Sequence, residues 1–373
     1  MDLEYLKKIN LSRKIHDFCR IFKQLKKANF EKTKDHITIK EDSIDTYENR
    51  FEHDLINCDR HFSIKYPKIE KFKLRDVYVV GQDGFVFTKK KELIYDGAIL
   101  KNKNLKKVRF PIKSLSKKLK GEYFHLCGIN SENHGHFVTQ FLPRILILKE
   151  YLNLHADVNV LVSFGQRRWQ KIYINALGIK SDRIVECNYG TLKIDVLNYI
   201  PFFHGNDGLV PKEYYLRLQN IFKNLIRGEN VKKEKILFLS RENAPNRRLN
   251  NEREVIDLIK KKFDQPVHKV LMEKHSLPEQ IRLCQEATHI FGPQGQAFLA
   301  CLFASNAKIV ILELFIPNWN MRDWAESFRN LGLYSGNKVA RLYSKVKYDH
   351  NRNWFQPLDE AEKFIDKLLN NNH

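Results

Sequence analysis

The stretch at residues 236–252, ILFLSRENAPNRRLNNE, decides the fold of this chain. Its first residues, 236–239, are apolar and predict a buried parallel strand, and the asparagines before Glu252 predict a helix start. The loop between them holds three arginines, namely Arg241, Arg247 and Arg248. Open α/β sheets bind ligands at the carboxyl ends of their strands, where guanidinium forks suit phosphate oxygens. The stretch therefore predicts an anion site, with a solvated basic loop as the alternative.

Strand and helix patterns alternate after this stretch. Strands are expected at residues 236–239, 267–271, 288–291 and 309–314, with helices at 252–263, 278–286 and 297–303 between them. This rhythm predicts a parallel, doubly wound sheet. The N-terminal half shows weaker βαβ alternation, with strands at 77–80, 85–87, 158–162 and 183–186 and a helix at 166–177. A helix at 211–226 precedes the basic stretch 227–235, which we interpret as the domain boundary.

The composition describes a folded protein with an anionic partner or substrate. The 373 residues are 43% hydrophobic and 12% aromatic, which allows two domains with ample cores. The 65 Lys and Arg exceed the 44 Asp and Glu, giving a net charge of +21. Nucleic acid, a lipid surface and a phosphorylated small molecule all fit that charge.

Cysteine usage and the N-terminal residues predict a cytoplasmic protein. The six cysteines include no CxxC pair, so neither a zinc site nor a disulfide framework is indicated. The N-terminus lacks the apolar core of a signal peptide, and the apolar run at 297–304 is too short to cross a bilayer. We expect a soluble or membrane-peripheral protein in a reducing compartment.

Residues 12–28 predict a basic amphipathic helix, followed by a linker that extends the N-terminal region to residue 60. Such a helix can lie on an anionic membrane, which would place the protein on the inner face of the cytoplasmic membrane. A helix packed on the domain with a solvated basic face is the equal alternative. The basic run 101–120 has only Phe110 for base stacking, which favours a solvated or lipid-facing surface over a nucleic-acid site.

A glycine-rich turn, Gly292-Pro293-Gln294-Gly295-Gln296, lies between a predicted strand and a predicted helix. Its small residues let the backbone approach a ligand, and the free N–H groups of the helix attract an anion. We expect the turn to share one sheet edge with the three arginines, so that two anion-binding devices converge. Glu313 ends a strand at the same edge. It is expected either to accept hydrogen bonds from ribose hydroxyls or to be a surface strand terminus.

Several motifs, taken in order, resemble glycosyltransferase family 61. They are Asn133…His136-Phe137…Leu142-Pro143-Arg144, Ser240-Arg241…Arg247-Arg248-Leu249-Asn250-Asn251-Glu252, Leu277-Pro278-Glu279-Gln280, Gly292-Pro293-Gln294-Gly295 and Ile311-Leu312-Glu313. The resemblance implies a GT-B-type α/β fold, in which two Rossmann-like lobes with parallel sheets face each other across a cleft. It also implies inverting, metal-independent transfer of a hexose or pentose from a nucleotide sugar. Bacterial relatives are associated with capsule and other surface polysaccharides.

Three positions depart from the pattern of that family. Gln294 stands where a histidine is usual, Phe137 where a tryptophan is common, and Gln140 where an acidic residue is frequent. Gln294 can hydrogen-bond a phosphate or a sugar hydroxyl, but it cannot carry a positive charge or take a proton. A catalytically inactive relative that binds nucleotide sugars is therefore one alternative. A basic nucleic-acid-binding protein is the other.

The resemblance assigns a role to each part of the chain. Residues 61–226 are expected to form an acceptor-side lobe and 227–345 a donor lobe. A C-terminal helix is expected in 346–373, with a return to the first lobe as one alternative. His136 is the first choice as general base and His134 the second, against the alternative of a loop histidine bonded to backbone. Asn133 and Gln140 are expected on the acceptor side. The expected donor-binding residues are Arg241, Arg247, Arg248, Asn251, Glu252, Gly292, Gln294, Gly295, Gln296 and Glu313.

The expected ligands follow from the same assignment. Arginines and helix N-termini can replace a metal while negative charge builds on the leaving diphosphate, so no metal or cofactor is expected. The donor is a co-substrate, for which we expect a UDP-sugar, and the acceptor is a glycan or a lipid-linked glycan. An anionic membrane surface is the expected partner of helix 12–28, and no nucleic acid is expected.

Overall fold

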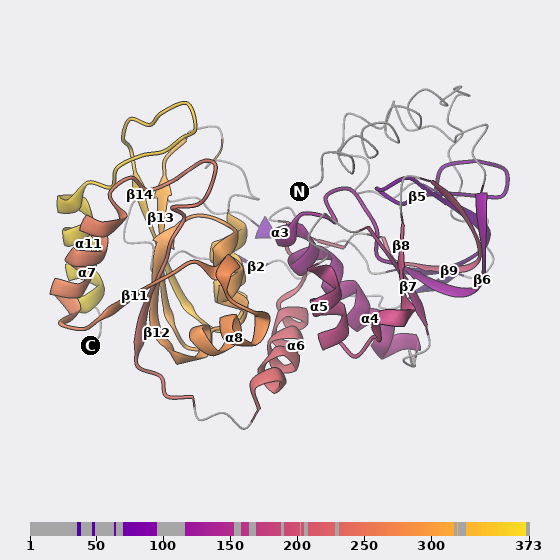
Figure 1. Ribbon diagram of the computed structural model, residues 1–373, viewed down its shortest axis with the longest axis horizontal. Helices are drawn as coiled ribbons and strands as arrows, with labels where there is room; N and C mark the ends of the chain where they lie inside the picture. The colour runs from indigo at the N-terminus through magenta and orange to yellow at the C-terminus, as the bar shows by residue number, and fades with distance from the viewer. Residues whose placement is uncertain are drawn as a thin grey trace. The chain divides into compact units, whose positions relative to one another are not determined.

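The computed structural model describes residues 36–38, 47–48, 63–64, 70–94, 116–152, 158–163, 169–187, 190–201, 203–204, 208–227, 231–316, 319 and 326–370. The chain forms two compact units (Figure 1). The first comprises Met1–Ile44 and Pro67–Phe203, and the second comprises Asp45–Tyr66 and His204–His373. The amphipathic helix predicted at residues 12–28 lies outside the described residues.

The second unit contains the predicted parallel sheet. Its strands are β10 (Lys235–Leu239), β11 (Val267–Val270), β12 (Ala287–Pro293), β13 (Lys308–Leu314) and β14 (Lys338–Ser344). They lie in the order β11-β10-β12-β13-β14, and every neighbouring pair is parallel. The apolar runs of β10 and β13 are buried, as two-sided burial of a parallel sheet requires, whereas β11 at the sheet edge exposes His268 and Lys269. Strand β14 was not predicted.

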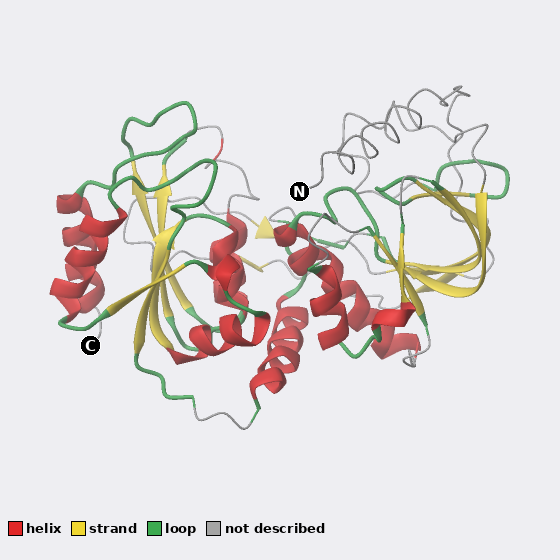
Figure 2. Cartoon of the chain, in the orientation of Figure 1, coloured by secondary structure: helices red, strands yellow, loops and turns green. Residues whose placement is uncertain are grey.

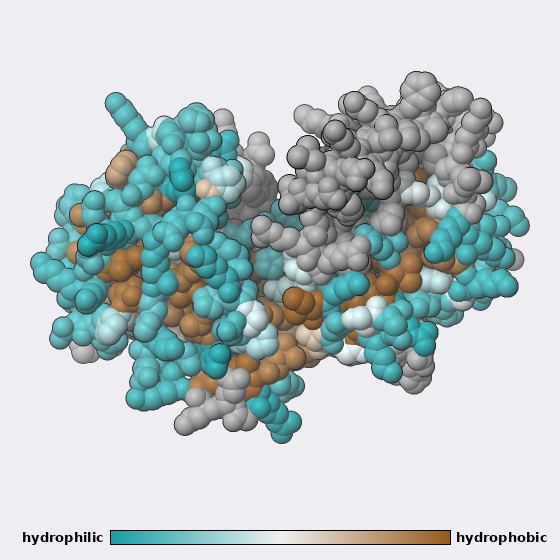
Figure 3. Space-filling view, in the orientation of Figure 1, coloured by the Kyte–Doolittle hydropathy of each residue, from teal (hydrophilic) through white to brown (hydrophobic). Residues whose placement is uncertain are grey.

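Helices cover both faces of this sheet (Figure 2). On one face lie α7 (Glu252–Phe263) and α11 (Leu358–Asn370), whose buried side chains join Phe238, Val310 and Leu342 in one core cluster. The other elements of the unit are α6 (Lys212–Lys223), η5 (Asn224–Ile226), η6 (Met272–Lys274), α8 (Leu277–Glu286), η7 (Gln296–Leu302) and α10 (Ser327–Tyr334). The outer surface over α7 and α11 is mostly hydrophilic (Figure 3), as amphipathic helices at a surface require.

Two boundaries differ from the sequence prediction. The main segment of the second unit begins at His204 rather than at residue 227, because α6 packs inside this unit. In that packing Tyr215 stacks on Tyr334 with ring centroids 6.2 Å apart, and Gln219 Nε2 donates to the carbonyl of Ala304 over 2.6 Å. The C-terminal helix α11 packs on α7 and stays with the second unit instead of joining the first.

The first unit contains a mixed sheet, not the wholly parallel one expected. Its strands are β1 (His36–Thr38), β4 (Glu70–Val80), β5 (Phe85–Phe87), β6 (Ser116–His125), β7 (Asn159–Val162), β8 (Ile184–Glu186) and β9 (Thr191–Tyr199). They lie in the order β1-β4-β9-β6-β7-β8, with β5 beside β4. Strands β9, β6, β7 and β8 run parallel, whereas β4 is antiparallel to β1, β5 and β9. A tight turn at residues 81–84 joins β4 to β5 in an antiparallel hairpin, and β4 is also antiparallel to the distant β9.

The remaining elements of the first unit follow β6 and β7. They are α3 (His134–His136), the π-helix η3 (Phe137–Phe141), α4 (Leu142–Leu152), α5 (Gln170–Ala176) and η4 (Ser181–Arg183). Strand β6 begins inside the basic run predicted as surface, and its Lys117, Lys118 and Lys120 are exposed while Leu119 is buried. The region predicted as a linker contributes β1 and β2 (Tyr47–Glu48), and β2 pairs with β3 (Ser63–Ile64). Among the helices of the described residues, none has the length and apolarity needed to span a bilayer.

Replacing Gly292 with alanine is expected to lower the free energy of unfolding. Gly292 has φ +155°, and an added Cβ would lie 2.5 Å from the carbonyl oxygen of Leu239 on the neighbouring strand. Gly336, with φ +79° and nothing within 4 Å of an added Cβ, is the matched control. Backbone strain alone costs about 1–3 kcal/mol in Gly336→Ala, and the clash in Gly292→Ala adds to it. Equal losses in the two variants, measured by denaturant unfolding, would contradict this packing.

Candidate functional site

The strand order of the second unit defines a binding edge. The order reverses direction between β10 and β12, and open α/β sheets bind ligands at the carboxyl ends of strands beside such a switch point. The arginine loop follows β10, and the turn at 292–296 ends β12. The two predicted anion-binding devices therefore meet at one edge. They are in contact, because a Cβ added to Gly295 would overlap the guanidinium of Arg241.

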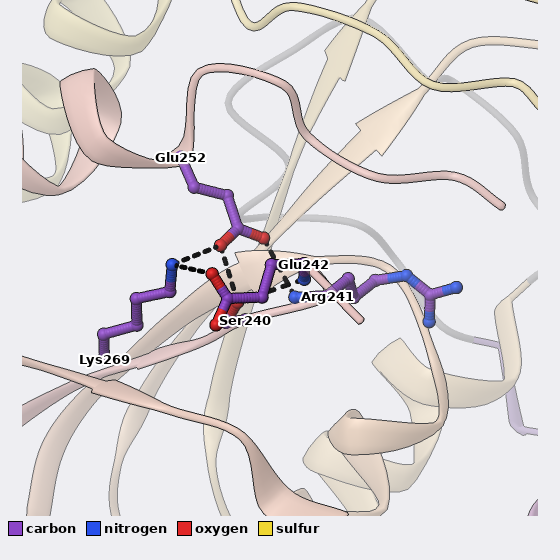
Figure 4. A network of polar contacts seen from close by, with 5 residues as sticks. All are labelled: Ser240, Arg241, Glu242, Glu252 and Lys269. Carbon is purple, nitrogen blue, oxygen red and sulfur yellow. Dashed lines mark hydrogen bonds and ion pairs between the residues drawn. The ribbon is translucent and has the colours of Figure 1, made fainter. Parts of the chain in front are cut away.

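A buried carboxylate fixes the start of the arginine loop (Figure 4). Glu252 Oε2 accepts a hydrogen bond from Ser240 Oγ over 2.6 Å, and its Oε1 accepts one from the backbone N–H of Arg241 over 2.9 Å. Lys269 Nζ lies 3.4 Å from Oε2 and 2.6 Å from the carboxylate of Glu242. Glu252 was expected to touch the donor, but its oxygens are occupied by the protein. It acts on the site by positioning Arg241.

The Arg241 side chain points away from this carboxylate (Figure 4). Its Nε donates to the carbonyl of Arg247 over 3.3 Å, and its Nη2 donates to the carbonyl of Asn246 over 3.0 Å. Burial and the nearby Arg247 cation lower the pKa of Arg241 to about 10, with Glu252 and Glu273 opposing them. The guanidinium stays charged at neutral pH. A bound anion would therefore relieve an electrostatic cost already present.

Arg247 and Gln294 line one small pocket. Its other lining residues are Pro293, Leu312, Leu314, Ile316, Trp319 and Trp354. The Cζ atom of Arg247 lies 5.5 Å from the ring centroid of Trp319, and the backbone N–H of Gln294 donates to the carbonyl of Leu312 over 2.9 Å. The pocket therefore combines a cation, an amide and aromatic surface, which suits a polar ligand with a planar or charged group. Trp319 was not predicted, because a single tryptophan after the last predicted strand carries no local signal.

Other predicted donor residues have partners within the protein. Asn251 exchanges two hydrogen bonds of 2.9 Å with the backbone of Gln356, so it anchors the C-terminal segment. Glu313 is buried and pairs with Arg341, whose Nε donates to Oε2 over 2.8 Å. This ion pair replaces the ribose contact expected for Glu313. Arg248 has an exposed side chain, and its backbone N–H donates to Asn353 Oδ1.

The helix after the glycine turn differs from the prediction. Gly292, Gly295 and the exposed Gln296 lead into η7, a 3-10 helix of 7 residues, in place of the expected α-helix. Such a short helix adds little dipole. The anion-binding character of this edge therefore rests on the arginines and on the close approach that glycine allows.

Asn133 and His134 have structural roles in the first unit. The Asn133 side chain caps α3 by accepting the backbone N–H groups of Gly135 at 2.9 Å and His136 at 3.3 Å. The Nε2 atom of His134 lies 2.9 Å from the Tyr173 hydroxyl, and its ring packs edge-on against Trp169. Burial lowers the pKa of His134 to about 4. Its hydrogen bond and ring packing make it the weaker candidate for the base.

His136 and Gln140 interact through their side chains. Burial lowers the pKa of His136, while a hydrogen bond from its ring to the Gln140 side chain acts in the opposite direction. The imidazole is therefore neutral at neutral pH, with one ring nitrogen paired to Gln140 and the other able to take a proton. Gln140 lies in η3 and His136 is its N-cap residue, and π-helical turns of this kind are often found at functional sites.

The cationic side chains of this α/β unit therefore lie where open sheets of this kind bind ligands. The model of the glycosyltransferase 61 family matches residues 134–311, a segment that includes His136, the arginine loop and the glycine turn. These residues form a glycosyltransferase 61 domain, and the chain is a glycosyltransferase. No curated protein matches the chain significantly.

The free energy of unfolding is expected to fall as the pH falls from about 6.5 to about 4. An unfolded chain protonates His134 near its ordinary pKa of 6.5, whereas the folded chain does so only near 4. The unfolded state therefore binds the extra proton throughout that window. His134→Gln removes this contribution, so its stability should decline less steeply than that of the wild type in denaturant unfolding at several pH values. If the free energies of unfolding of His134→Gln and the wild type changed equally with pH, the burial of His134 would be contradicted.

Proposed function

We propose that this glycosyltransferase moves a sugar from a nucleoside diphosphate sugar, with a UDP-sugar as the expected donor, to a glycan or lipid-linked acceptor. The transfer inverts the anomeric configuration and uses no metal. The proposed pathway is the synthesis of bacterial surface polysaccharide, either capsule or lipopolysaccharide. The single observation that carries the proposal is the contact between the Arg241 guanidinium and the Gly295 backbone at the switch point of the parallel sheet.

Electrostatics supports a diphosphate at this edge. The Arg247 cation lowers the pKa of Arg241, the Arg352 cation lowers that of Arg247, and the nearby Glu252 and Glu313 are engaged with other groups. The edge therefore keeps an excess of positive charge. When the sugar leaves, the bond between the anomeric carbon and the phosphate oxygen breaks and its electron pair stays with the diphosphate. Preorganised guanidinium groups stabilise the charge that develops on that oxygen.

The acceptor side of the proposal rests on His136. A neutral imidazole takes the proton of the acceptor hydroxyl while the hydroxyl oxygen bonds to the anomeric carbon, on the face opposite the leaving diphosphate. Gln140 fixes the ring, because its side chain bonds to one ring nitrogen. Gln294 cannot take a proton, so the base role falls to His136, and Gln294 is left to hydrogen-bond the donor.

Binding and turnover should separate in two variants. We expect Arg241→Ala to weaken UDP binding at least 10-fold by calorimetry, because the cation at the glycine turn is lost. We expect His136→Ala to keep that affinity and to lose at least 100-fold in sugar transfer. Arg253→Ala, which removes an exposed arginine on α7, is the charge-matched control. Unchanged UDP affinity in Arg241→Ala would remove the donor site, and full turnover in His136→Ala would assign the base elsewhere.

The same experiment tests the alternatives. A nucleic-acid-binding protein would be stabilised by RNA or DNA more than by UDP, and that stabilisation would disappear in moderate salt. An inactive relative, which Gln294 favours, would bind UDP without transferring or hydrolysing any sugar in a panel of nucleotide sugars.

We further propose a peripheral location on the inner face of the cytoplasmic membrane, through the basic residues 12–28. Electrostatic attraction to anionic lipid contributes about 1 kcal/mol per basic residue near the surface. Full-length protein is expected to sediment with vesicles containing phosphatidylglycerol, and protein lacking residues 1–28 is expected to remain in solution. A truncated protein that still sediments would exclude this anchor.

A further inference from the structure

We propose that Arg352 and Arg247 together form a second anion subsite, which takes the second phosphate of the nucleoside diphosphate donor. The inference rests on the proposed function and names a further binding residue for it. Arg352 belongs to a turn between β14 and α11, outside the segment 134–311 that matches the family. No sequence pattern singles it out.

The two arginines share one aromatic ring. The Cζ atom of Arg247 lies 5.5 Å from the Trp319 ring centroid, and that of Arg352 lies 5.6 Å from it. Cation–π attraction holds each guanidinium near the ring and partly offsets their mutual repulsion. Burial lowers the pKa of Arg247, and the charge of Arg352 lowers it further. A bound anion between the two side chains would remove that repulsion.

Both arginines have an uncommon backbone conformation. Arg247 has φ +55° and Arg352 has φ +60°, which is the left-handed region that side chains other than glycine seldom adopt. Hydrogen bonds between the two loops hold this conformation. The N–H of Arg247 donates to the carbonyl of Asn351 over 2.9 Å, and the N–H of Trp354 donates to the carbonyl of Arg248 over 3.0 Å. Strained residues fixed in this way are typical of binding sites.

The turn that carries Arg352 is ordered by a single carboxylate. Asp349 Oδ1 accepts the backbone N–H groups of Asn351 and Asn353, each over 2.8 Å, and its Oδ2 accepts Asn353 Nδ2 over 2.8 Å. Asn353 in turn accepts the backbone N–H of Arg248. The Asp349 carboxylate is therefore engaged by the turn, which presents Arg352 beside the arginine loop. A ligand meets a guanidinium that is already in place.

A diphosphate fits this arrangement better than a single phosphate. Arg241 is electrostatically coupled to Arg247, and Arg247 to Arg352, so three cations follow one another from the glycine turn to Trp319. One phosphate group can contact the guanidinium groups at only one end of this row of arginines. Two linked phosphates can each meet a guanidinium, and planar forks favour that geometry.

The test measures binding of UDP, UMP and inorganic pyrophosphate to the full chain by calorimetry. Arg352→Gly is the principal variant, because glycine accepts φ +60° and leaves the turn unstrained. We expect it to keep the melting temperature, to weaken UDP and pyrophosphate binding about 10-fold, which equals about 1.4 kcal/mol, and to change UMP binding little. Arg352→Lys should recover part of the loss. Arg253→Ala, on the exposed side of α7, should behave as the wild type.

The outcomes separate this inference from the proposed function. Unchanged UDP and pyrophosphate affinity in Arg352→Gly overturns the subsite, even when Arg241→Ala still abolishes UDP binding and the donor site stands. Equal losses of affinity for UMP and UDP also overturn the subsite, because the Arg352 guanidinium would then not contact the second phosphate. Pyrophosphate binding that depends on Arg352 in a protein that transfers no sugar supports the subsite and rejects the proposed activity. A wild type that binds neither UDP nor pyrophosphate rejects both.

Discussion

The carboxylate of Glu252 holds the end of β10 to the beginning of α7, and the binding edge depends on this contact. By accepting both the Ser240 hydroxyl and the Arg241 N–H, it sets the direction in which the chain leaves the sheet. A buried carboxylate that loses such donors leaves unsatisfied polar groups in the core, so the loop has little freedom to rearrange. The direction of Arg241, and hence its contact with Gly295, follows from that constraint.

The second unit separates two kinds of buried charge. Arg341 lies between Glu313 and Glu326, at 2.8 Å and 2.5 Å, and this cluster is closed inside the protein. The Arg241 guanidinium instead donates to two backbone carbonyls, and the Arg247 guanidinium lies near the ring of Trp319, neither of which neutralises a charge. The first arrangement pairs its charges within the protein, so that removing one partner would leave an unpaired buried charge. The second keeps positive charge available at the edge where a nucleotide would bind.

Local signals predicted the parts of this protein that local chemistry determines. The apolar run at 236–239 and the asparagine–glutamate start of α7 were found where expected, and the sheet edge they share with the glycine turn was correct. Partners distant in sequence were not predictable. Asn251 bonds to Gln356 and Glu313 to Arg341, and nothing near Asn251 or Glu313 reveals those partners. The antiparallel pairing of β4 with β9 was missed for the same reason, since β9 lies more than a hundred residues after β4.

The turn that carries Arg352 is synthesised late, so the arginine loop cannot be completed until that turn has been made. The arginine loop at 241–250 leaves the ribosome about a hundred residues before Asn351, Asn353 and Trp354, which bond to its backbone. Domains fold as units while the chain emerges, so the sheet around β10 and β12 can assemble first. The hydrogen bonds that fix the loop can form only when nearly the whole chain has been synthesised. A chain terminated before residue 351 would retain Arg241 and Arg247 but lack the hydrogen bonds that hold the arginine loop. The binding edge of its sheet would be incomplete.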